Sequence, residues 1–267
     1  MDLYVKGNRD FSTIILLYLC VFFTACKKDR VENIGVFKGI SKTSQGKVSS
    51  IFEFSSDNHP KEILYNATLP YLTGITTLKI KYQLNYVGKN LSSATIESGG
   101  IPVAVDFTVN VNGQITSAKF KGQRNDVMYN YDSGGRLVSS NGGATKFEYE
   151  YNAGGKLETI VLRNTQGIIR TKVTVTTDDH TNPLAGIPLV YLEEDIPMWT
   201  WFSLSKNNIT SLIYTHYDTS GNTVETQKYI FSYTYDKEQR PQSLKRYTLI
   251  EYEKGDKGFF EAFNYNY

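Results

Sequence analysis

Carboxylates next to a histidine are the first residues in this chain whose types suggest chemistry. Asp178 and Asp179 directly precede His180 and could bind a cation, but adjacent residues on a strand point to opposite faces, so we expect a solvated turn. Glu193 and Glu194 are also adjacent, whereas the two carboxylates of a glycosidase act across a gap of about 5–10 Å. No histidine has a partner at metal-ligand spacing, and the chain contains neither a GxSxG elbow nor a P-loop. We therefore predict no catalytic residues, no metal site and no cofactor.

Aromatic side chains gather in an irregular segment at about residues 180–203. This segment contains both tryptophans, and three of the seven prolines, so it should leave the sheet as a loop with a short helix. One interpretation is a plug or lid that buries the tryptophans at one end of the sheet, and we favour it. The other is a recognition loop that binds a glycan or peptide ligand, in which both tryptophans would be partly exposed. Its candidate binding residues are Tyr191, Trp199, Trp201 and Phe202.

The N-terminus carries an export signal. Residues 11–25 are an apolar run behind Lys6 and Arg9, too short for a membrane-spanning helix and typical of a signal peptide. The run ends at Ala25-Cys26, which resembles the lipobox of bacterial lipoproteins. That resemblance implies a signal peptide over 1–25, lipidation of Cys26 and an outer-membrane location, since Lys27 replaces the aspartate that resembles an inner-membrane retention signal. An ordinary cleaved signal or an uncleaved anchor is the alternative.

A repeat of 20 residues indicates how the elements are built. Residues 129–137 (YNYDSGGRL) align with residues 149–157 (YEYNAGGKL). A third copy begins at 233 with a longer predicted turn, and a fourth lies at 216–222. Aromatic residues at alternating positions share one face of a strand, and the Asp or Asn followed by Gly forms a turn. Each repeat therefore predicts one β-hairpin.

The hairpins together predict an all-β fold. We expect an antiparallel up-and-down meander of about 12–16 strands, either a curled sheet or a closed barrel. The expected organisation is a tether over residues 26–48 and a single domain over 49–267, interrupted by the segment at 180–203.

Two family resemblances rest on these motifs. The hairpin unit resembles the YD repeats of Rhs-type shell proteins. The whole chain resembles a family of exported Gram-negative lipoproteins that carry a domain of unknown function with a porin-like fold. The second resemblance rests on the lipobox, the hairpins and the segments NPL at 182–184 and LSKNNI at 204–209. It implies a curled or closed antiparallel sheet, and no known activity.

Composition narrows the function further. The aromatic fraction is 13% and the net charge is +2, which argues against a disordered chain and gives no footprint for nucleic acid. The leading hypothesis is a non-catalytic, lipid-anchored protein of the cell envelope that binds a glycan or peptide or serves as a structural component. An integral outer-membrane β-barrel is the alternative, because residues 263–267 alternate aromatic and polar residues as its C-terminal strand would. A glycan-active enzyme is the least favoured.

Overall fold

The computed structural model describes residues 37–44, 47–55, 60–71, 74–122, 126–192, 199–251 and 257–267. These residues belong to one compact unit that runs to the C-terminus. The predicted signal peptide (1–25), Cys26 and the first part of the predicted tether lie outside the described residues. No helix in the described part of the chain is long and apolar enough to cross a membrane.

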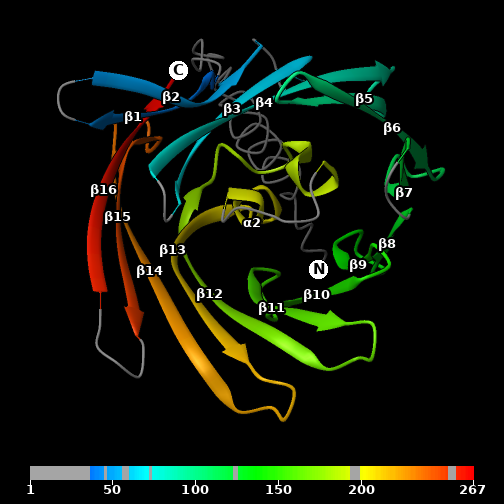
Figure 1. The fold of residues 1–267 in the computed structure, drawn as a ribbon. Coiled ribbons are helices and arrows are strands. Elements are labelled where there is room, and N and C mark those ends of the chain that lie inside the picture. The colour runs from blue at the N-terminus through cyan, green and yellow to red at the C-terminus, as the bar shows by residue number, and fades with distance from the viewer. Residues whose placement is uncertain are drawn as a thin grey trace, which may run out of the picture. The chain divides into compact units, whose positions relative to one another are not determined.

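Within the described residues, sixteen antiparallel strands close into a barrel (Figure 1). The strands are β1 (Gly39–Ser44), β2 (Lys47–Phe54), β3 (Glu62–Tyr71), β4 (Gly74–Val87), β5 (Asn90–Ser98), β6 (Ile101–Val109), β7 (Ile115–Phe120), β8 (Val127–Tyr131), β9 (Leu137–Asn141), β10 (Thr145–Tyr151), β11 (Leu157–Asn164), β12 (Ile169–Thr181), β13 (Asn207–Tyr217), β14 (Thr223–Tyr235), β15 (Pro241–Glu251) and β16 (Lys257–Asn266). Each strand pairs with its neighbours in sequence, so the predicted all-β, up-and-down meander is confirmed.

The barrel is closed by its first and last strands. Strand β1 pairs with β16 from Gly39 opposite Asn266 to Lys42 opposite Phe263. The barrel therefore begins at Gly39, and the prediction that the tether extends to residue 48 is wrong. The physical reason is that β2 and β16 would otherwise both be open edges, and β1 supplies hydrogen-bond partners to each.

The two faces of the sheet differ in polarity. The inward face carries the apolar side chains, as in the pair Ile63 opposite Tyr82, both of which are buried. The outward face carries ion pairs, including Glu148 with Lys146 at 2.7 Å and with Arg163 at 2.9 Å. The hydrophobic core thus lies inside the barrel, and these ion pairs lie on its outer face.

The repeated hairpins share one turn. In the first copy, the Asp132 carboxylate accepts a hydrogen bond from the Arg136 backbone N–H at 2.9 Å and pairs with its guanidinium at 2.7 Å. Gly135 in this turn has a φ of +78°, which an L side chain rarely adopts. The same turn begins at Asn110, Asn152, Asn164, Asp218 and Asp236. The third copy was expected to have a longer turn, which is wrong, because the turn of residues 236–240 repeats that of 132–136.

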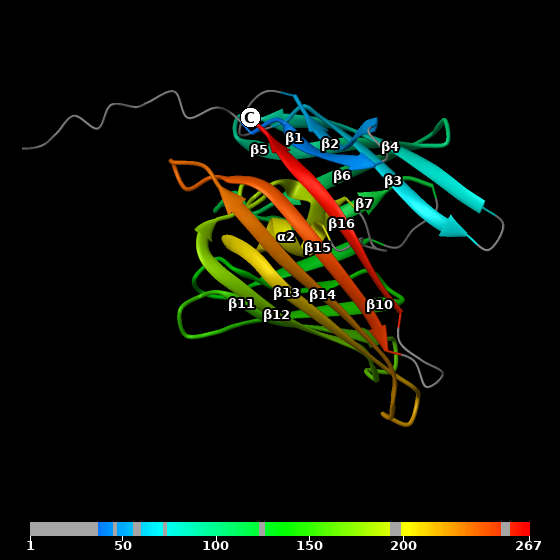
Figure 2. The ribbon, with the colours of Figure 1, turned by 90° about the vertical axis from the view of Figure 1, so that its left-hand side faces the viewer.

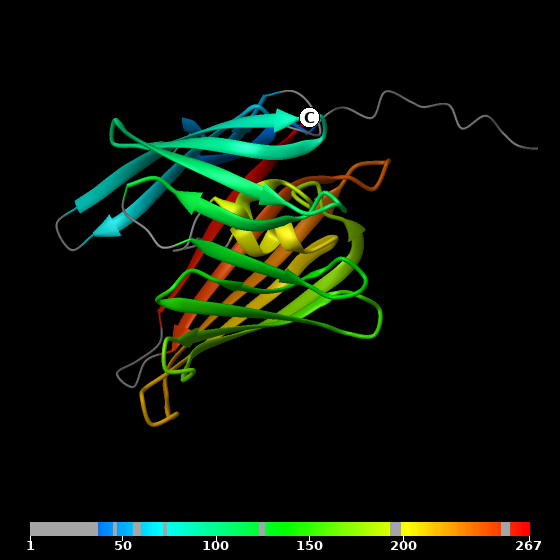
Figure 3. The ribbon, with the colours of Figure 1, turned by 90° about the vertical axis from the view of Figure 1, so that its right-hand side faces the viewer.

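The irregular segment between β12 and β13 forms a plug. It contains a 3₁₀ turn, η1 (Pro188–Tyr191), and a short helix, α2 (Trp199–Leu204). The helix lies within the ring of strands (Figures 2 and 3). The predicted irregular segment with a short helix is therefore confirmed, although Glu193, Glu194 and Pro197 lie outside the described residues.

Candidate functional site

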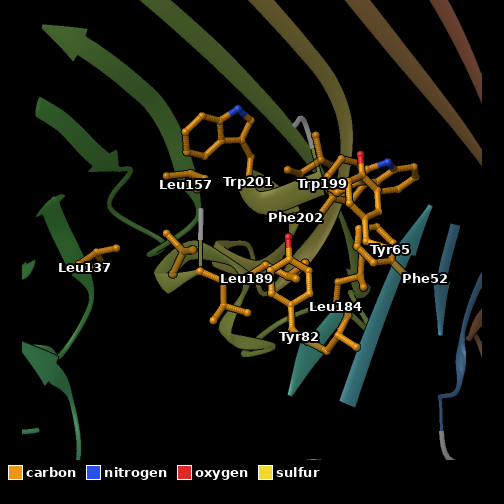
Figure 4. Close-up of a cluster of buried hydrophobic side chains, with 14 of the residues drawn as sticks. Phe52, Tyr65, Tyr82, Leu137, Leu157, Leu184, Leu189, Trp199, Trp201 and Phe202 are labelled. Carbon is orange, nitrogen blue, oxygen red and sulfur yellow. The ribbon is translucent and has the colours of Figure 1, made fainter. Parts of the chain in front are cut away.

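The plug packs its aromatic side chains against several strands of the barrel (Figure 4). The Trp199 ring meets Phe52 of β2 and Phe263 of β16 edge to face, with centroids 5.9 and 5.3 Å apart. Phe202 meets Phe231 of β14 in the same way at 5.3 Å. One short helix thus contacts strands on both sides of the closure between β1 and β16.

Trp201 contacts a different part of the wall. Its ring lies 5.6 Å from that of Phe147 and 6.2 Å from that of Tyr149, both on β10. Its indole Nε1 donates a hydrogen bond to the Tyr214 hydroxyl on β13 at 2.9 Å. The polar atom of a buried indole is therefore satisfied, as burial requires.

The exposure of these rings decides between the two interpretations of the segment. Trp199 is 5% exposed, Trp201 is 4% exposed and Phe202 is fully buried. The partial exposure expected of ligand-binding tryptophans is wrong for both rings, because their apolar surface is removed from water against the barrel wall. Their packing agrees with the interpretation of this segment as a plug.

Tyr191, the fourth candidate, lies at the end of η1 and is half-buried. Its ring meets that of Tyr129 edge to face at 4.9 Å, and its hydroxyl is 3.0 Å from that of Tyr131. Burial raises the pKa of Tyr191, so the phenol is neutral at physiological pH. Tyr191 thus joins the plug to the first copy of the repeat.

A buried amide fixes the plug to its own base. The Asn182 Nδ2 donates to the carbonyl oxygens of Phe202 at 2.6 Å and Ser205 at 2.9 Å. Its Oδ1 accepts from the backbone N–H of Leu184 at 3.0 Å. This side chain therefore ties the entrance of the segment to its exit and supports α2 inside the barrel.

Beyond the plug, toward the turn between β13 and β14, the inward face becomes polar. We call the residues Tyr214, His216, Glu225, Gln227 and Tyr229 the luminal cluster. The β13–β14 register places Tyr214 opposite Gln227 and His216 opposite Glu225. The Tyr229 hydroxyl donates to Gln227 Oε1 at 2.8 Å, and Gln227 Nε2 donates to Glu225 Oε1. Glu225, Gln227 and Tyr229 thus form a hydrogen-bonded row on β14, and Tyr214 and His216 lie beside it on β13.

Solvent reaches this row although it faces inward. All five side chains of the luminal cluster are only partly buried. By contrast, Leu212 and Phe231, the inward residues next to it on the same strands, are 0% and 3% exposed. The interior is therefore closed to solvent at the level of Leu212, whereas the luminal cluster keeps partial exposure.

A group of charges borders the luminal cluster. Glu261 on β16 pairs with Lys42 on β1 at 2.5 Å and with Arg246 on β15. The Arg246 guanidinium also lies over the Tyr229 ring, 5.9 Å from its centroid. Burial, and then the charge of Arg246, lower the pKa of Lys42. Two cations thus share one carboxylate at this side of the interior.

Sequence patterns did not indicate this region. The copy of the repeat at 216–222 begins with His216, but the His216 ring nitrogen Nδ1 lies 3.0 Å from the Thr171 hydroxyl on β12, which is 45 residues earlier in the chain. The run ETQKY at 225–229, which places Glu225, Gln227 and Tyr229 on one face of a strand, is a signal that could have indicated it. In the described part of the chain, no three or more His, Cys, Asp or Glu side chains form a group that could hold a metal ion.

No protein-family model matches the chain. No curated protein matches it either. Among solved structures, it is similar to a porin-like protein from Bacteroides uniformis, with 13% identity and a TM-score of 0.40, over 85% of this chain and 95% of that one. It is also similar to a porin-like protein from Bacteroides vulgatus, with 10% identity and a TM-score of 0.37, over 86% and 98% of the two chains. A third similarity is to a chain of the TcdB2-TccC3-Cdc42 structure, with 11% identity and a TM-score of 0.33, over 80% of this chain but 12% of that one.

Proposed function

We propose that this protein is a non-catalytic, lipid-anchored β-barrel of the cell envelope that binds a glycan at the luminal cluster. The observation that carries the proposal is the partial exposure of inward-facing aromatic and polar side chains beside a sealed plug. Ligand sites typically combine aromatic surfaces with a few placed polar groups. Tyr214 and Tyr229 would supply the aromatic surfaces, and Gln227 and Glu225 the hydrogen bonds to sugar hydroxyls.

The closed barrel favours a glycan over a peptide. An extended peptide commonly binds by adding a strand to an exposed sheet edge. Here β1 and β16 pair with each other, so the barrel has no free edge. A glycan needs no backbone partner and can use the side chains of the interior alone.

The polarity of the outer face argues against the alternative of an integral outer-membrane barrel. Such a barrel needs an outward apolar band about 25 Å tall. In this protein the buried apolar side chains face inward, and the outward face carries pairs such as Lys81 with Glu62 at 2.8 Å and Lys121 with Asp106 at 3.0 Å. The export signal and Cys26 support attachment to the envelope through lipid instead.

Fractionation tests the anchoring. The wild-type chain should be found in the membrane fraction. The Cys26→Ser variant, produced with a cytoplasmic start in place of the signal peptide, should be soluble and retain the far-UV circular dichroism of a β protein. A variant that stays in the membrane fraction or aggregates would support the integral barrel.

Glycan binding can be followed through the tryptophan emission. Trp201 donates a hydrogen bond to Tyr214 of the luminal cluster, so a bound glycan should change its fluorescence. A panel of envelope and host polysaccharide fragments would be screened, and any hit titrated against Gln227→Leu. This variant should weaken binding about tenfold, as expected for loss of one net hydrogen bond of about 1.4 kcal/mol.

A matched control is Gln83→Leu, an exposed glutamine on β4 that lies outside the luminal cluster. It should bind as the wild type does. If no glycan binds, or if both variants bind equally well, the luminal cluster is not a glycan site and a structural role remains.

A further inference from the structure

Two basic side chains point into the barrel beside the luminal cluster. Lys42 on β1 lies opposite Phe263 on β16, and Arg246 on β15 lies opposite Phe231 on β14. Both phenylalanines face inward and are 3% exposed. Residues directly opposite each other in an antiparallel pair share one face of the sheet, so both basic side chains also face inward. We call Lys42 and Arg246 the luminal cations.

The luminal cations border the same space as the luminal cluster. The Arg246 guanidinium lies 5.9 Å from the centre of the Tyr229 ring. The side chain of Lys42 is 27% exposed and that of Arg246 is 17% exposed. Because both side chains point inward, their exposed atoms face the interior that the luminal cluster lines. A molecule bound along Tyr229 would therefore lie next to the guanidinium.

The charges around the luminal cations do not balance. Glu261 forms ion pairs with both of them, so these three side chains carry one positive charge in excess. Burial, and then the charge of Arg246, lower the pKa of Lys42, although its ammonium lies 2.5 Å from the Glu261 carboxylate. The surroundings of Lys42 thus remain unfavourable for a cation. A further negative group at this place would stabilise both luminal cations.

The acid of the luminal cluster lies at its other end. Glu225 is four residues from Tyr229 along β14, which is about 13 Å at about 3.3 Å per residue. This distance exceeds the Debye length of about 8 Å at physiological ionic strength. The luminal cluster therefore has a basic end beside Arg246 and an acidic end at Glu225, and the acidic end does not cancel the basic one.

The polar residues at the far end of β12 form contacts with one another instead. The Asp178 Oδ2 accepts a hydrogen bond from the Tyr235 hydroxyl and lies 3.5 Å from His180 Nδ1, and Gln239 Oε1 lies 3.0 Å from His180 Nε2. The His180 ring stacks on that of Tyr235 at 3.9 Å. The turn expected at 178–180 is wrong, because these residues belong to β12. Asp179 is solvated as expected, with its side chain 95% exposed.

We propose that the luminal cations bind the anionic group of an acidic glycan, either the carboxylate of a uronic acid or a sulfate ester. This inference rests on the proposed function, which places a glycan at the luminal cluster, and it names the class of glycan. A guanidinium donates parallel N–H groups to oxyanions, and hydrogen bonds between charged groups are about twice as strong as neutral ones. The Tyr229 ring beside Arg246 would contact the sugar ring that carries the anion.

The proposal is tested by calorimetry on the full-length chain in non-ionic detergent, with two matched pairs of ligands. One pair is trigalacturonate and its fully methyl-esterified form, which has the same skeleton without the charges. The other is a sulfated disaccharide and its desulfated form. In at least one pair the charged form should bind about 10–100-fold more tightly, as expected for a hydrogen bond to a charged group. The pair with the larger ratio identifies the anion, and the ratio should fall as salt is added.

A substitution then assigns the preference to the luminal cations. Lys42→Met removes the excess positive charge and keeps the ion pair of Arg246 with Glu261, so it should lower the ratio of charged to uncharged binding about tenfold. The matched control is Lys245→Met, an exposed lysine next to Arg246 in the chain, which should keep the wild-type ratio. The comparison of charged and uncharged ligands on the wild type needs no variant, so it stands even if Lys42→Met fails to fold.

The outcomes separate this inference from the proposed function. If charged and uncharged forms bind equally well in both pairs, the luminal cations bind no anion, and the luminal cluster remains a site for neutral glycans. If both lysine variants keep the wild-type ratio, the preference arises elsewhere and the inference is likewise overturned. If no glycan of either kind binds, the proposed function fails together with it.

Discussion

Replacement of Trp199 by alanine measures how much the plug stabilises the barrel. The ring is 5% exposed and meets Phe52 and Phe263 edge to face, and Phe202 at 5.2 Å. A buried tryptophan removes about 200 Å² from water, which at about 25 cal/mol per Å² is about 5 kcal/mol. Measured Trp→Ala losses in cores are about 3–5 kcal/mol, so we expect a loss of about 4 kcal/mol in the free energy of unfolding.

The assay is urea unfolding followed by far-UV circular dichroism, because the substitution itself changes the tryptophan fluorescence. For a domain of this size the expected loss lowers Tm by about 8–16 °C. The matched control is Phe260→Ala, an aromatic residue on β16 that is 77% exposed, which should cost less than about 0.5 kcal/mol. If Trp199→Ala loses less than about 1 kcal/mol, or no more than the control, the helix does not act as a plug and the reasoning from its burial is refuted.

Two further predictions concern the sheet and its turns. Gly39→Ala should lower the free energy of unfolding by more than about 2 kcal/mol, since a Cβ there would lie 2.0 Å from the Phe52 carbonyl oxygen. The control Gly88→Ala has a φ of +63° but nothing within 4 Å of the new Cβ, so it should lower the free energy of unfolding by about 1 kcal/mol. Equal losses in chemical unfolding would contradict the predicted clash at Gly39. Hydrogen bonds from the Arg136 backbone and side chain lower the pKa of Asp132, so its contribution to stability is present above the unfolded-state pKa and is lost as pH falls through the folded-state pKa. Asp132→Asn should therefore differ from the wild type in Tm at pH 7, and the difference should shrink as pH falls below 3.8 and through the folded-state pKa. A constant difference would show that the carboxylate charge plays no part.

Local signals in the sequence were sufficient for the repeated hairpins. The turn at residues 132–136 depends on an aspartate, a glycine and an arginine within five residues, so its geometry is written in neighbouring positions. Prolines and tryptophans between 180 and 203 likewise indicated where the strands stop. Such interactions join residues that are close in sequence, so they form in the same way wherever the segment lies in the fold.

The exposure of the aromatic side chains and the residues that meet in the polar clusters could not be predicted from the sequence in the same way. The sequence placed Trp199 and Trp201 in one segment, but only the surrounding strands decide that both rings are buried. His216 lies 3.0 Å from Thr171 across 45 positions in the chain, and His180 lies 3.0 Å from Gln239 across 59. No local spacing rule connects such pairs.

The sequence by itself therefore determined that the chain alternates polar and apolar residues into hairpins and interrupts them once. The tertiary structure decided that β1 and β16 close the barrel, that the apolar face turns inward around α2, and which polar side chains meet at each end. The physical reason is the register between strands. A shift of one residue would send every side chain of a strand to the opposite face, and only the pairing of all strands with a filled interior selects one register.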